Sequence, residues 1–391
     1  MPQLVVTENQ KLLKVQPPKV LGIVGFRVFP DLMGGQKHVA NYYRLLSKHT
    51  QLVLCVSGDN EEPAIASITT YRFLFNHWKS LFNIIYIFRL ARLIRKHAID
   101  IVLIDHSYFG WLGICLQKLT NKPFVIKSAN LEFQRFKETN RPFWFVYKSY
   151  EKWVHQQAAH SFFITTEDKD WALKEFGLQE KKTSILPYFL STPNTVLTKE
   201  EARNTLIHGF KLTPSTLLFY FNGTLDYAPN VEALNTLVNT IIPLLYEKKL
   251  LFKIFITGNR ISNQLKSTLQ QQPDIIYEGY VTDTALYHLG TDCFICMLTS
   301  STGVKTKIVE ALGYGQKVIS TKIAANGFSD INWGHQFQLV DHTNMALFAE
   351  KMASIEINND SSTPTAFYEK HDPSRIIKDS LLSLQHAVQQ H

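Results

Sequence analysis

The sequence predicts an α/β fold with two domains, each built on a parallel β-sheet. At 391 residues, the chain is longer than one hydrophobic core usually allows. Short β-branched apolar runs alternate with segments of helical periodicity, which is the pattern of βαβ units. Two prolines and small polar residues interrupt this alternation at 184–195. We therefore expect an N-terminal domain at 1–190, a C-terminal domain at 191–370, and a helix at 371–391 that returns to the first domain.

Each half supplies its own set of strands. In the first half we expect a helix at 38–49, strands at 19–26, 51–57, 99–105 and 122–129, and a strand with a capped helix within 160–177. In the second half we expect a long helix at 230–245 and strands at 216–223, 251–258, 275–281, 292–298 and 316–324. Ligands of such sheets gather at the carboxyl ends of the strands, so we expect a cleft between the two domains.

Composition favours a soluble globular enzyme. Hydrophobic residues make up 45% of the chain and charged residues 19%. The longest apolar run, at 81–88, is far too short to span a membrane. The first residues lack the apolar segment of a signal peptide. We expect a cytoplasmic protein.

The cysteines predict burial rather than metal binding. Cys293 and Cys296 form a C-x-x-C, but no second pair supplies two further ligands. Their surroundings, DCFICML, resemble a buried strand, on which the two thiols point to opposite faces. The D-x-D within 167–170 opens a predicted helix and is typical of capping and solvation. We expect no metal site.

The net charge of +8 is unevenly distributed. Residues 1–190 hold 25 Lys and Arg against 15 Asp and Glu, whereas the remainder holds 16 against 18. The densest basic stretch is 73–100, in which apolar and basic residues alternate with helical periodicity from Phe88 to Lys96, and such a helix could rest on an anionic membrane surface. The alternative is an ordinary helix that packs its apolar side on a sheet and leaves its arginines solvated. No nucleic-acid-binding motif accompanies the charge.

The stretch SSTGVKTKIVEAL, at 300–312, has the composition of a phosphate site. A glycine at a helix start lets a ligand approach bare N–H groups, where the helix dipole favours an anion. Lys305 and Lys307 add charge, and Glu310 lies about 9 Å beyond Val304 if both are helical. A diphosphate joined to a nucleoside would use all of these groups. The alternative is a surface helix with solvated charges.

Several segments resemble the family 4 retaining glycosyltransferases, which have the GT-B fold of two Rossmann-like domains. In the C-terminal half the likeness rests on GVKTKIVEALGYGQKVIST and FNGTLDYAPNVEAL, the second of which suggests a subgroup with a GTLDYAPN-type turn. In the N-terminal half it rests on MGGQKHVANYYRLLSK, SANLEFQRF, FFITTEDKDWALKEFG and SILPYF. The likeness covers nearly the whole chain and does not name the sugar.

The resemblance assigns roles residue by residue. Glu310 would hold the donor ribose, and Lys305, or alternatively Lys307, would neutralise the leaving nucleoside diphosphate. The backbone of Gly303 and Val304 would face the sugar and diphosphate. The donor-binding positions that the resemblance implies are Gly34, Gly35, Gly223, Thr224, Gly258, Tyr280, Val281, Thr302, Gly303, Val304 and Lys307.

The chain departs from the family pattern at several positions. Thr302 stands where the family has a glutamate that contacts donor hydroxyls. Thr224 and, approximately, Asn230 stand where cations normally stabilise the diphosphate, and Ala129 replaces a histidine near the reacting carbon.

Four residues of the N-terminal half are candidates for contact with the sugar or the acceptor. Asn130 and Glu132 match the family's Asn-x-Glu, although Asn130 could instead cap a helix and Glu132 could pair with Arg135. His106 and Asp105 follow a strand end, and His106 is a candidate replacement for the missing histidine.

The leading hypothesis is transfer of a sugar from a nucleotide sugar to a hydroxyl acceptor with retention of configuration. The acceptor would be a glycan, a lipid-linked saccharide or a small molecule. We expect no cofactor or metal, leave UDP and GDP undecided, and expect no nucleic-acid partner. Peripheral membrane contact through 73–100 stays open. The alternatives are a catalytically silent nucleotide-binding or partner-binding relative, and a nucleotide-sugar epimerase.

Overall fold

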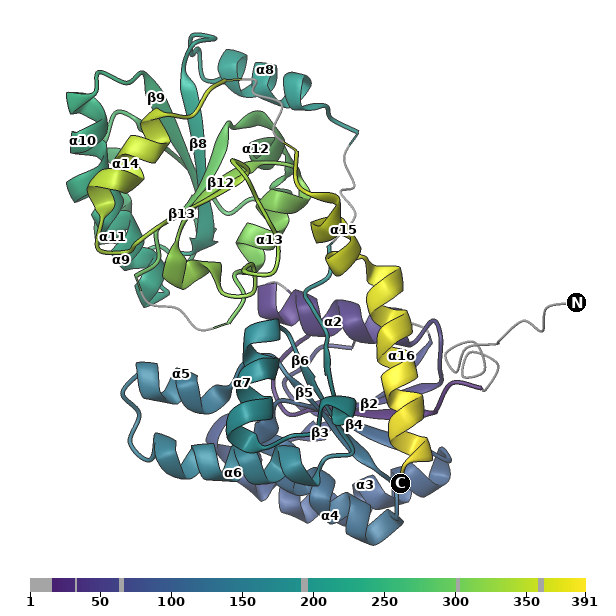
Figure 1. Ribbon diagram of the computed structural model, residues 1–391. Coiled ribbons are helices and arrows are strands. Elements are labelled where there is room, and N and C mark those ends of the chain that lie inside the picture. The colour runs from purple at the N-terminus through teal and green to yellow at the C-terminus, as the bar shows by residue number, and fades with distance from the viewer. Residues whose placement is uncertain (1–15, 32–33, 63–66, 191–195, 300–302, 358–361) are drawn as a thin grey trace, which may run out of the picture. The chain divides into compact units, whose positions relative to one another are not determined.

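The computed structural model (Figure 1) describes residues 16–31, 34–62, 67–190, 196–299, 303–357 and 362–391. The chain divides into two compact units. The N-terminal unit comprises residues 1–189 together with 370–391, and the C-terminal unit comprises residues 190–369. We describe each unit by itself.

The N-terminal unit is built on a seven-stranded parallel sheet with strand order β3-β2-β1-β4-β5-β6-β7. Its strands are β1 (Val20–Val24), β2 (Leu52–Ser57), β3 (Ile68–Leu74), β4 (Ile101–Asp105), β5 (Phe124–Ser128), β6 (His160–Phe163) and β7 (Thr183–Ile185). Every residue of β1, β2, β4 and β5 is buried. A strand that is covered on both faces has no polar side, which explains the unbroken apolar runs of the sequence.

Helices cover both faces of this sheet. Val20 and Val24 of β1 pack toward α2 (Gly34–Leu46) and α16 (Pro373–Gln389), which lie side by side in Figure 1. Leu21 and Ile23 point the other way, toward α3 (Ile87–Lys96), α4 (Gly110–Thr120) and α6 (Trp144–Gln157). The remaining helical elements are η1 (His77–Tyr86), η2 (Ser107–Phe109), α5 (Glu132–Glu138), α7 (Thr166–Phe176) and η3 (Glu180–Lys182).

The basic helix of the sequence is shorter than the stretch 73–100, and its apolar side is not exposed. Leu90, Leu93 and Ile94 of α3 are buried in the core beneath the sheet. The strand β3, which the helical interpretation overlooked, and the 3₁₀ segment η1 occupy the start of the stretch. The interpretation of an ordinary sheet-covering helix is therefore correct for α3 itself.

The C-terminal unit repeats the architecture with a six-stranded parallel sheet in the order β10-β9-β8-β11-β12-β13. Its strands are β8 (Leu217–Thr224), β9 (Phe252–Asn259), β10 (Ile275–Gly279), β11 (Cys293–Cys296), β12 (Lys317–Thr321) and β13 (Phe337–Val340). Its α-helices are α8 (Lys199–Gly209), α9 (Ala228–Thr236), α10 (Ile242–Glu247), α11 (Asn263–Gln270), α12 (Ala285–Gly290), α13 (Thr306–Gly313) and α14 (Met345–Ala353). A 3₁₀ turn, η5 (Lys322–Ala325), follows β12, and α15 (Thr365–His371) leads back to the N-terminal unit.

The long helix expected at 230–245 is interrupted by a π-helical turn. This turn, η4 (Leu237–Ile241), stands between α9 and α10, and Pro243 lies in the first turn of α10. Proline lacks an N–H and clashes with the carbonyl one turn earlier, so the widened turn lets the chain pass this residue without ending the helix.

Cys293 and Cys296 lie in β11 and are buried with free thiols. Among the described residues, no three His, Cys, Asp or Glu side chains come close enough together to hold a metal ion. None of the helices in the described ranges has the length and apolar character needed to cross a bilayer.

Candidate functional site

The candidate donor site of the C-terminal unit is organised by Lys307, which projects from the first turn of α13. Its ammonium donates to the backbone carbonyl of Asn222 at 3.1 Å and to Oδ1 of Asn230 at 2.9 Å, and it lies 4.8 Å from the ring centre of Phe221. Burial lowers the pKa of Lys307. The side chain therefore places a fixed, partly desolvated cation at the carboxyl end of β8.

Asn230 and Gly223 form the floor beneath this ammonium. Asn230 is buried, and its Nδ2 donates to the carbonyl of Thr224 at 2.9 Å. A Cβ on Gly223 would lie 2.7 Å from Nδ2 of Asn230 and 3.3 Å from Nζ of Lys307, so any other residue would displace these two side chains. Thus Asn230 holds the ammonium of Lys307 at the carboxyl end of β8.

The loop before α13 carries the predicted amide donors. Gly303 is buried and has a left-handed φ of 69°, which favours glycine at this position. Lys305 is the N-cap residue of α13, so the helix begins only at Thr306. The spacing of about 9 Å between Val304 and Glu310 therefore does not apply as a distance along one helix. Thr302 lies outside the described residues.

Glu310 is half-buried in α13. The pKa values of Tyr220 and Tyr314 are raised chiefly by burial, and the charge of Glu310 raises both further. This carboxylate lies on the same helix as Lys307, three residues further on. Residues three apart on a helix are neighbours on its surface. The predicted ribose contact and the fixed cation thus share one side of α13.

The positions predicted to cradle the base lie after neighbouring strands. Gly258 is in β9, where an added Cβ would stand 2.1 Å from the carbonyl oxygen of Gly223, so close contact between β8 and β9 already requires a glycine. Tyr280 and Val281 follow β10, and Tyr280 is exposed. Strands β8, β9 and β10 are neighbours in the sheet, so their carboxyl ends share one edge.

In the N-terminal unit the structure brings His106 and Glu132 together. Nδ1 of His106 lies 3.2 Å from Oε1 of Glu132. Oε2 of Glu132 accepts from the hydroxyl of Tyr108 at 2.5 Å and pairs with Nε of Arg135 at 2.9 Å. Burial raises the pKa of Glu132, but the neighbouring His106, Arg135 and Tyr108 lower it by more, to about 2. Glu132 is therefore a carboxylate fixed at the carboxyl edge of the sheet.

The backbone at His106 is strained. This residue directly follows β4 and has φ 64° and ψ 145°, a backbone conformation that residues other than glycine rarely adopt. The imidazole packs edge-on to Phe26, with ring centres 5.1 Å apart, and 16% of its side chain is exposed. The fold thus holds the ring in a defined orientation at the loop after β1 and β4.

Glu151 of α6 holds the start of α5 in place. It accepts from the backbone N–H groups of Glu132 and Phe133, both at 3.1 Å, and from the hydroxyl of Ser107 at 2.7 Å. Burial raises its pKa to about 7 despite these hydrogen bonds. The carboxylate occupies the N-terminus of α5, where bare N–H groups favour an anion.

The other N-terminal candidates divide into surface and core positions. Asn130 does not cap α5, because the N-cap residue is Leu131, whose side chain makes no capping hydrogen bond. Asp105 is a core residue that accepts from Tyr43 at 2.5 Å and pairs with the buried Lys127, so it does not face a ligand. Ala129 follows β5, the strand beside β4.

Gly34 and Gly35 begin α2. The hydroxyl of Tyr188 donates to the Gly34 carbonyl at 3.0 Å. An added Cβ on Gly35 would meet nothing within 4 Å, so protein packing does not require a glycine there. That openness is compatible with the predicted approach of a ligand.

From the sequence, Lys307 received less weight than Lys305, and Tyr108 and Glu151 were overlooked. The importance of Tyr108 and Lys307 could have been predicted from their positions in the sequence. Tyr108 follows His106 by two residues, and Lys307 is one turn before Glu310. Glu151 offers no such cue, because its role depends on where α6 packs.

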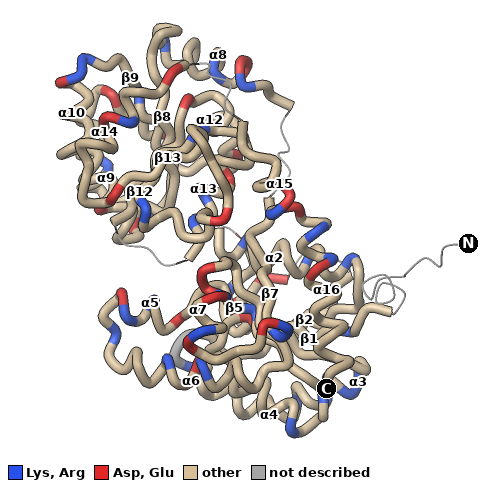
Figure 2. The backbone as a smooth tube through the Cα atoms, in the orientation of Figure 1, with Lys and Arg blue, Asp and Glu red and all other residues tan. Residues whose placement is uncertain are grey.

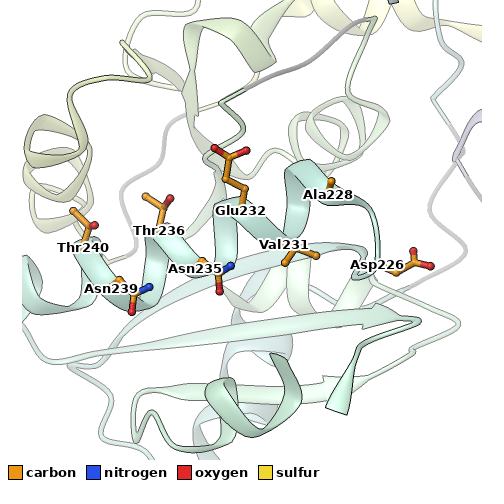
Figure 3. Close-up of a pocket in the computed structure, with 8 residues that line it drawn as sticks. All are labelled: Asp226, Ala228, Val231, Glu232, Asn235, Thr236, Asn239 and Thr240. Carbon is orange, nitrogen blue, oxygen red and sulfur yellow. The ribbon is translucent and has the colours of Figure 1, made fainter. Parts of the chain in front are cut away.

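A separate recess runs along α9 and the π turn (Figure 3). It is lined by Asp226, Ala228, Val231, Glu232, Asn235, Thr236, Asn239 and Thr240. Its two charged residues are both acidic, which does not suit a diphosphate. The recess contains none of the predicted site residues.

Both units match known family models. Residues 33–192 match the model of Glycosyltransferase Family 4, and residues 216–357 match the model of glycosyl transferases group 1. Together they cover about three quarters of the chain. No curated protein sequence matches the chain significantly.

Solved structures show the same fold across both units. A glycosyltransferase from Rickettsia africae is 14% identical with a TM-score of 0.62, and the match covers 95% of this chain and 94% of that one. Sucrose-phosphate synthase from Thermosynechococcus elongatus is 13% identical with a TM-score of 0.65 and the same coverage. HepE from Anabaena, in complex with UDP, is 12% identical with a TM-score of 0.67, covering 93% of this chain and 98% of that one. With its two family matches and two Rossmann-like sheets, the chain belongs to the glycosyltransferases of the GT-B fold, with a Family 4 N-terminal unit and a group 1 C-terminal unit.

Proposed function

We propose that the protein transfers a hexose from a nucleotide sugar to a hydroxyl acceptor with retention of anomeric configuration. The observation that carries this proposal is the arrangement on α13. Lys307 is fixed at the end of β8, Gly303 precedes the helix N-terminus, and Glu310 lies one turn beyond Lys307. These groups supply a cation and backbone amides for the diphosphate, and a carboxylate that accepts hydrogen bonds from the ribose hydroxyls of the nucleoside.

In this mechanism, catalysis depends on the charge that grows on the departing diphosphate. The ammonium of Lys307, helped by Lys305, and the amides at Gly303 and Val304 stabilise that charge more in the transition state than in the ground state. The departing phosphate oxygen accepts the acceptor proton, so the reaction needs no dedicated base. Glu310 holds the ribose hydroxyls, and no step passes through a metal ion or cofactor.

The N-terminal unit would orient the sugar and the acceptor. His106 and Glu132 are fixed at the carboxyl edge of the sheet, and Asn130 lies in the loop directly before the helix that Glu132 begins. We assign to His106 the sugar contact that the family's histidine makes, since Ala129 has no side chain able to make it. Gly34 and Gly35 would admit the diphosphate to the start of α2.

UDP is the first nucleotide to test. The Anabaena protein HepE was solved in complexes with UDP, with UDP and glucose, and with UDP-glucose. Thermal unfolding of the purified protein with UDP, GDP and ADP, and with their glucose or mannose esters, would identify the base, because a bound ligand raises the melting temperature.

Two variants test the site itself. Lys305→Ala should weaken UDP binding and turnover, and Glu310→Ala should mainly weaken recognition of the ribose. Release of UDP and sugar from a donor would exclude a catalytically silent relative, and conversion of a donor without an acceptor into an epimeric nucleotide sugar would indicate an epimerase. If both variants bind the nucleotide like the wild type, the assignment of the donor site is wrong.

We also propose a cytoplasmic location with peripheral contact at an anionic membrane. The large exposed apolar residues around η1 support this, and they are Leu81, Phe82, Ile84, Ile85 and Phe88. Exposed basic residues, Arg92 and Lys96, follow on α3. This contact would use η1 and the start of α3, since the apolar side of α3 is buried.

A further inference from the structure

The connection between α5 and α6 presents aromatic side chains to solvent. Phe143 is 68% exposed, Phe145 57% and Val146 55%. Large apolar side chains are normally exposed singly, so three within four residues on one helix start form a patch. We call residues 141–146 the α5–α6 tip.

The backbone holds this patch outward against a conformational cost. Phe143 has a φ of 63° and Asn140 a φ of 49°, both left-handed, and neither is glycine. Such a conformation is unfavourable for a bulky residue such as phenylalanine. Hydrogen bonds from Arg141 N to Phe136 O at 2.8 Å and from Tyr147 N to Phe143 O at 3.1 Å fix the turn. The exposed position of Phe143 is therefore built into the fold.

Basic side chains lie against neighbouring aromatic rings of α5 and α6. Arg141 lies 5.1 Å from the ring centre of Phe136, and Lys137 lies 5.2 Å from that of Trp144. Between Phe133 and Tyr150 the chain has four basic residues and one acid, Glu138. Figure 2 marks the basic residues along α5 and α6. A surface of aromatic and cationic groups complements the headgroup region of an anionic bilayer.

The topology places the tip at the same edge of the sheet as His106 and Glu132. Helix α6 leads into the amino end of β6, so its own N-terminus lies toward the carboxyl ends of the parallel strands. The segment η1 follows the carboxyl end of β3, and α3, α4 and α6 are successive neighbours on one face. The tip and η1 thus flank the loops that hold the candidate acceptor residues.

We infer that the α5–α6 tip docks on the surface of an anionic bilayer, and that the acceptor hydroxyl belongs to a lipid or lipid-linked saccharide presented there. This rests on the proposed sugar transfer and specifies its acceptor class. Aromatic rings at the headgroup level would anchor the unit, and Arg141 and Lys137 would meet lipid phosphates. A contact between two copies through the same face would bring like charges together, which disfavours that occupant.

Sedimentation with lipid vesicles tests the docking without requiring catalysis. The full-length wild type should bind vesicles of phosphatidylglycerol and phosphatidylcholine, bind pure phosphatidylcholine much less, and weaken as salt rises. The Phe143→Ser/Phe145→Ser variant should lose about tenfold or more in vesicle affinity. The matched control Leu251→Ser/Leu339→Ser removes two exposed leucines of the C-terminal unit, 53% and 44% exposed, and should bind like the wild type.

Arg141→Glu provides a second variant whose exposed side chain is not needed for the core, and it should reduce binding to anionic vesicles selectively. Circular dichroism and the thermal shift with UDP confirm that each variant is folded and binds nucleotide, so failure of docking and failure of the donor site are separable. The inference is wrong if the wild type does not bind anionic vesicles, or if the double variant binds them as tightly as the wild type. It is also wrong if the wild type is a dimer, the double variant is a monomer and neither binds vesicles, because the tip would then contact a second copy.

Discussion

The ammonium of Lys307 lies 2.9 Å from Oδ1 of Asn230, so a lysine from α13 is held at the carboxyl end of β8 by a residue of α9. The carbonyl of Asn222 accepts a second of its three N–H donors at 3.1 Å. Both partners are neutral. The positive charge is therefore oriented but not neutralised, which is the condition for strong stabilisation of an incoming anion.

Replacing Lys307 should separate its binding role from that of Lys305. Lys307→Met keeps the aliphatic stem but removes the charge, and we expect it to abolish most of the thermal stabilisation by UDP. It should also reduce the free energy of unfolding by about 1–3 kcal/mol, because Asn230 and the Asn222 carbonyl lose a partner in a part-buried site. Thermal unfolding with and without UDP measures both effects. The exposed Lys266→Met is the control, and a Lys307→Met protein that UDP stabilises normally would transfer the role to Lys305.

Gly35 allows function to be tested without loss of stability. It lies within α2, and an added Cβ would meet nothing within 4 Å, so Gly35→Ala should raise the free energy of unfolding by about 0.5–1 kcal/mol. If a donor approaches the backbone here, the same methyl group should weaken donor binding and turnover. Gly209→Ala, also at a helical glycine with open space, provides the control. Unchanged kinetics in Gly35→Ala would remove this glycine from the donor site.

The sequence predicted the alternation of strands and helices because buried parallel strands are apolar on both faces. The elements that it overlooked lack that cue. The edge strand β3 has mixed burial, and β7 and β13 are only three and four residues long. In the basic stretch at 73–100, the helical alternation of apolar and basic residues runs from Phe88 to Lys96, and Ile87–Lys96 is α-helical. The end of β3 and the 3₁₀ segment η1, which precede this helix, were not predicted.

The candidate site was predictable where its residues are close in sequence. Gly303, Lys307 and Glu310 lie within one loop and helix. The partnership of Lys307 with Asn230 was not predictable, since these residues are 77 positions apart and meet only when β8 and β11 pair. The same applies to Asp105, whose position after a strand suggested a functional residue. Its orientation toward Tyr43 and Lys127 depends on the packing of α2 and β5.

The buried ion pair of Lys127 and Asp105 should be costly to break. Both side chains are almost fully buried, and Tyr43 also donates to the same carboxylate. Lys127→Met leaves that carboxylate buried without a cation, so the free energy of unfolding should fall by about 3–5 kcal/mol. Adding Asp105→Asn removes the uncompensated charge and should recover part of the loss. Urea unfolding of the two single variants and the double variant gives the coupling energy, and simple additivity would contradict a direct pairing.

The raised pKa of Glu151 predicts that this side chain favours folding more at acidic pH than at neutral pH. Burial brings its pKa to about 7, against 4.5 for an unperturbed glutamate. Between these values the native state holds a proton that the unfolded state has lost, so the contribution is complete below about pH 4.5 and is lost as pH rises through 7. The shift corresponds to about 3 kcal/mol.

Glu151→Gln is neutral at every pH, although its amide group faces one of the two N–H groups of Glu132 and Phe133 and adds a constant penalty. Urea unfolding at pH 4.5 and pH 8 should therefore show the wild type losing about 3 kcal/mol more than Glu151→Gln over this interval. The exposed Glu175→Gln should follow the wild type, because it changes no buried charge. Equal pH dependence in the wild type and Glu151→Gln would mean that Glu151 stays ionised against the start of α5, held there by its three hydrogen bonds.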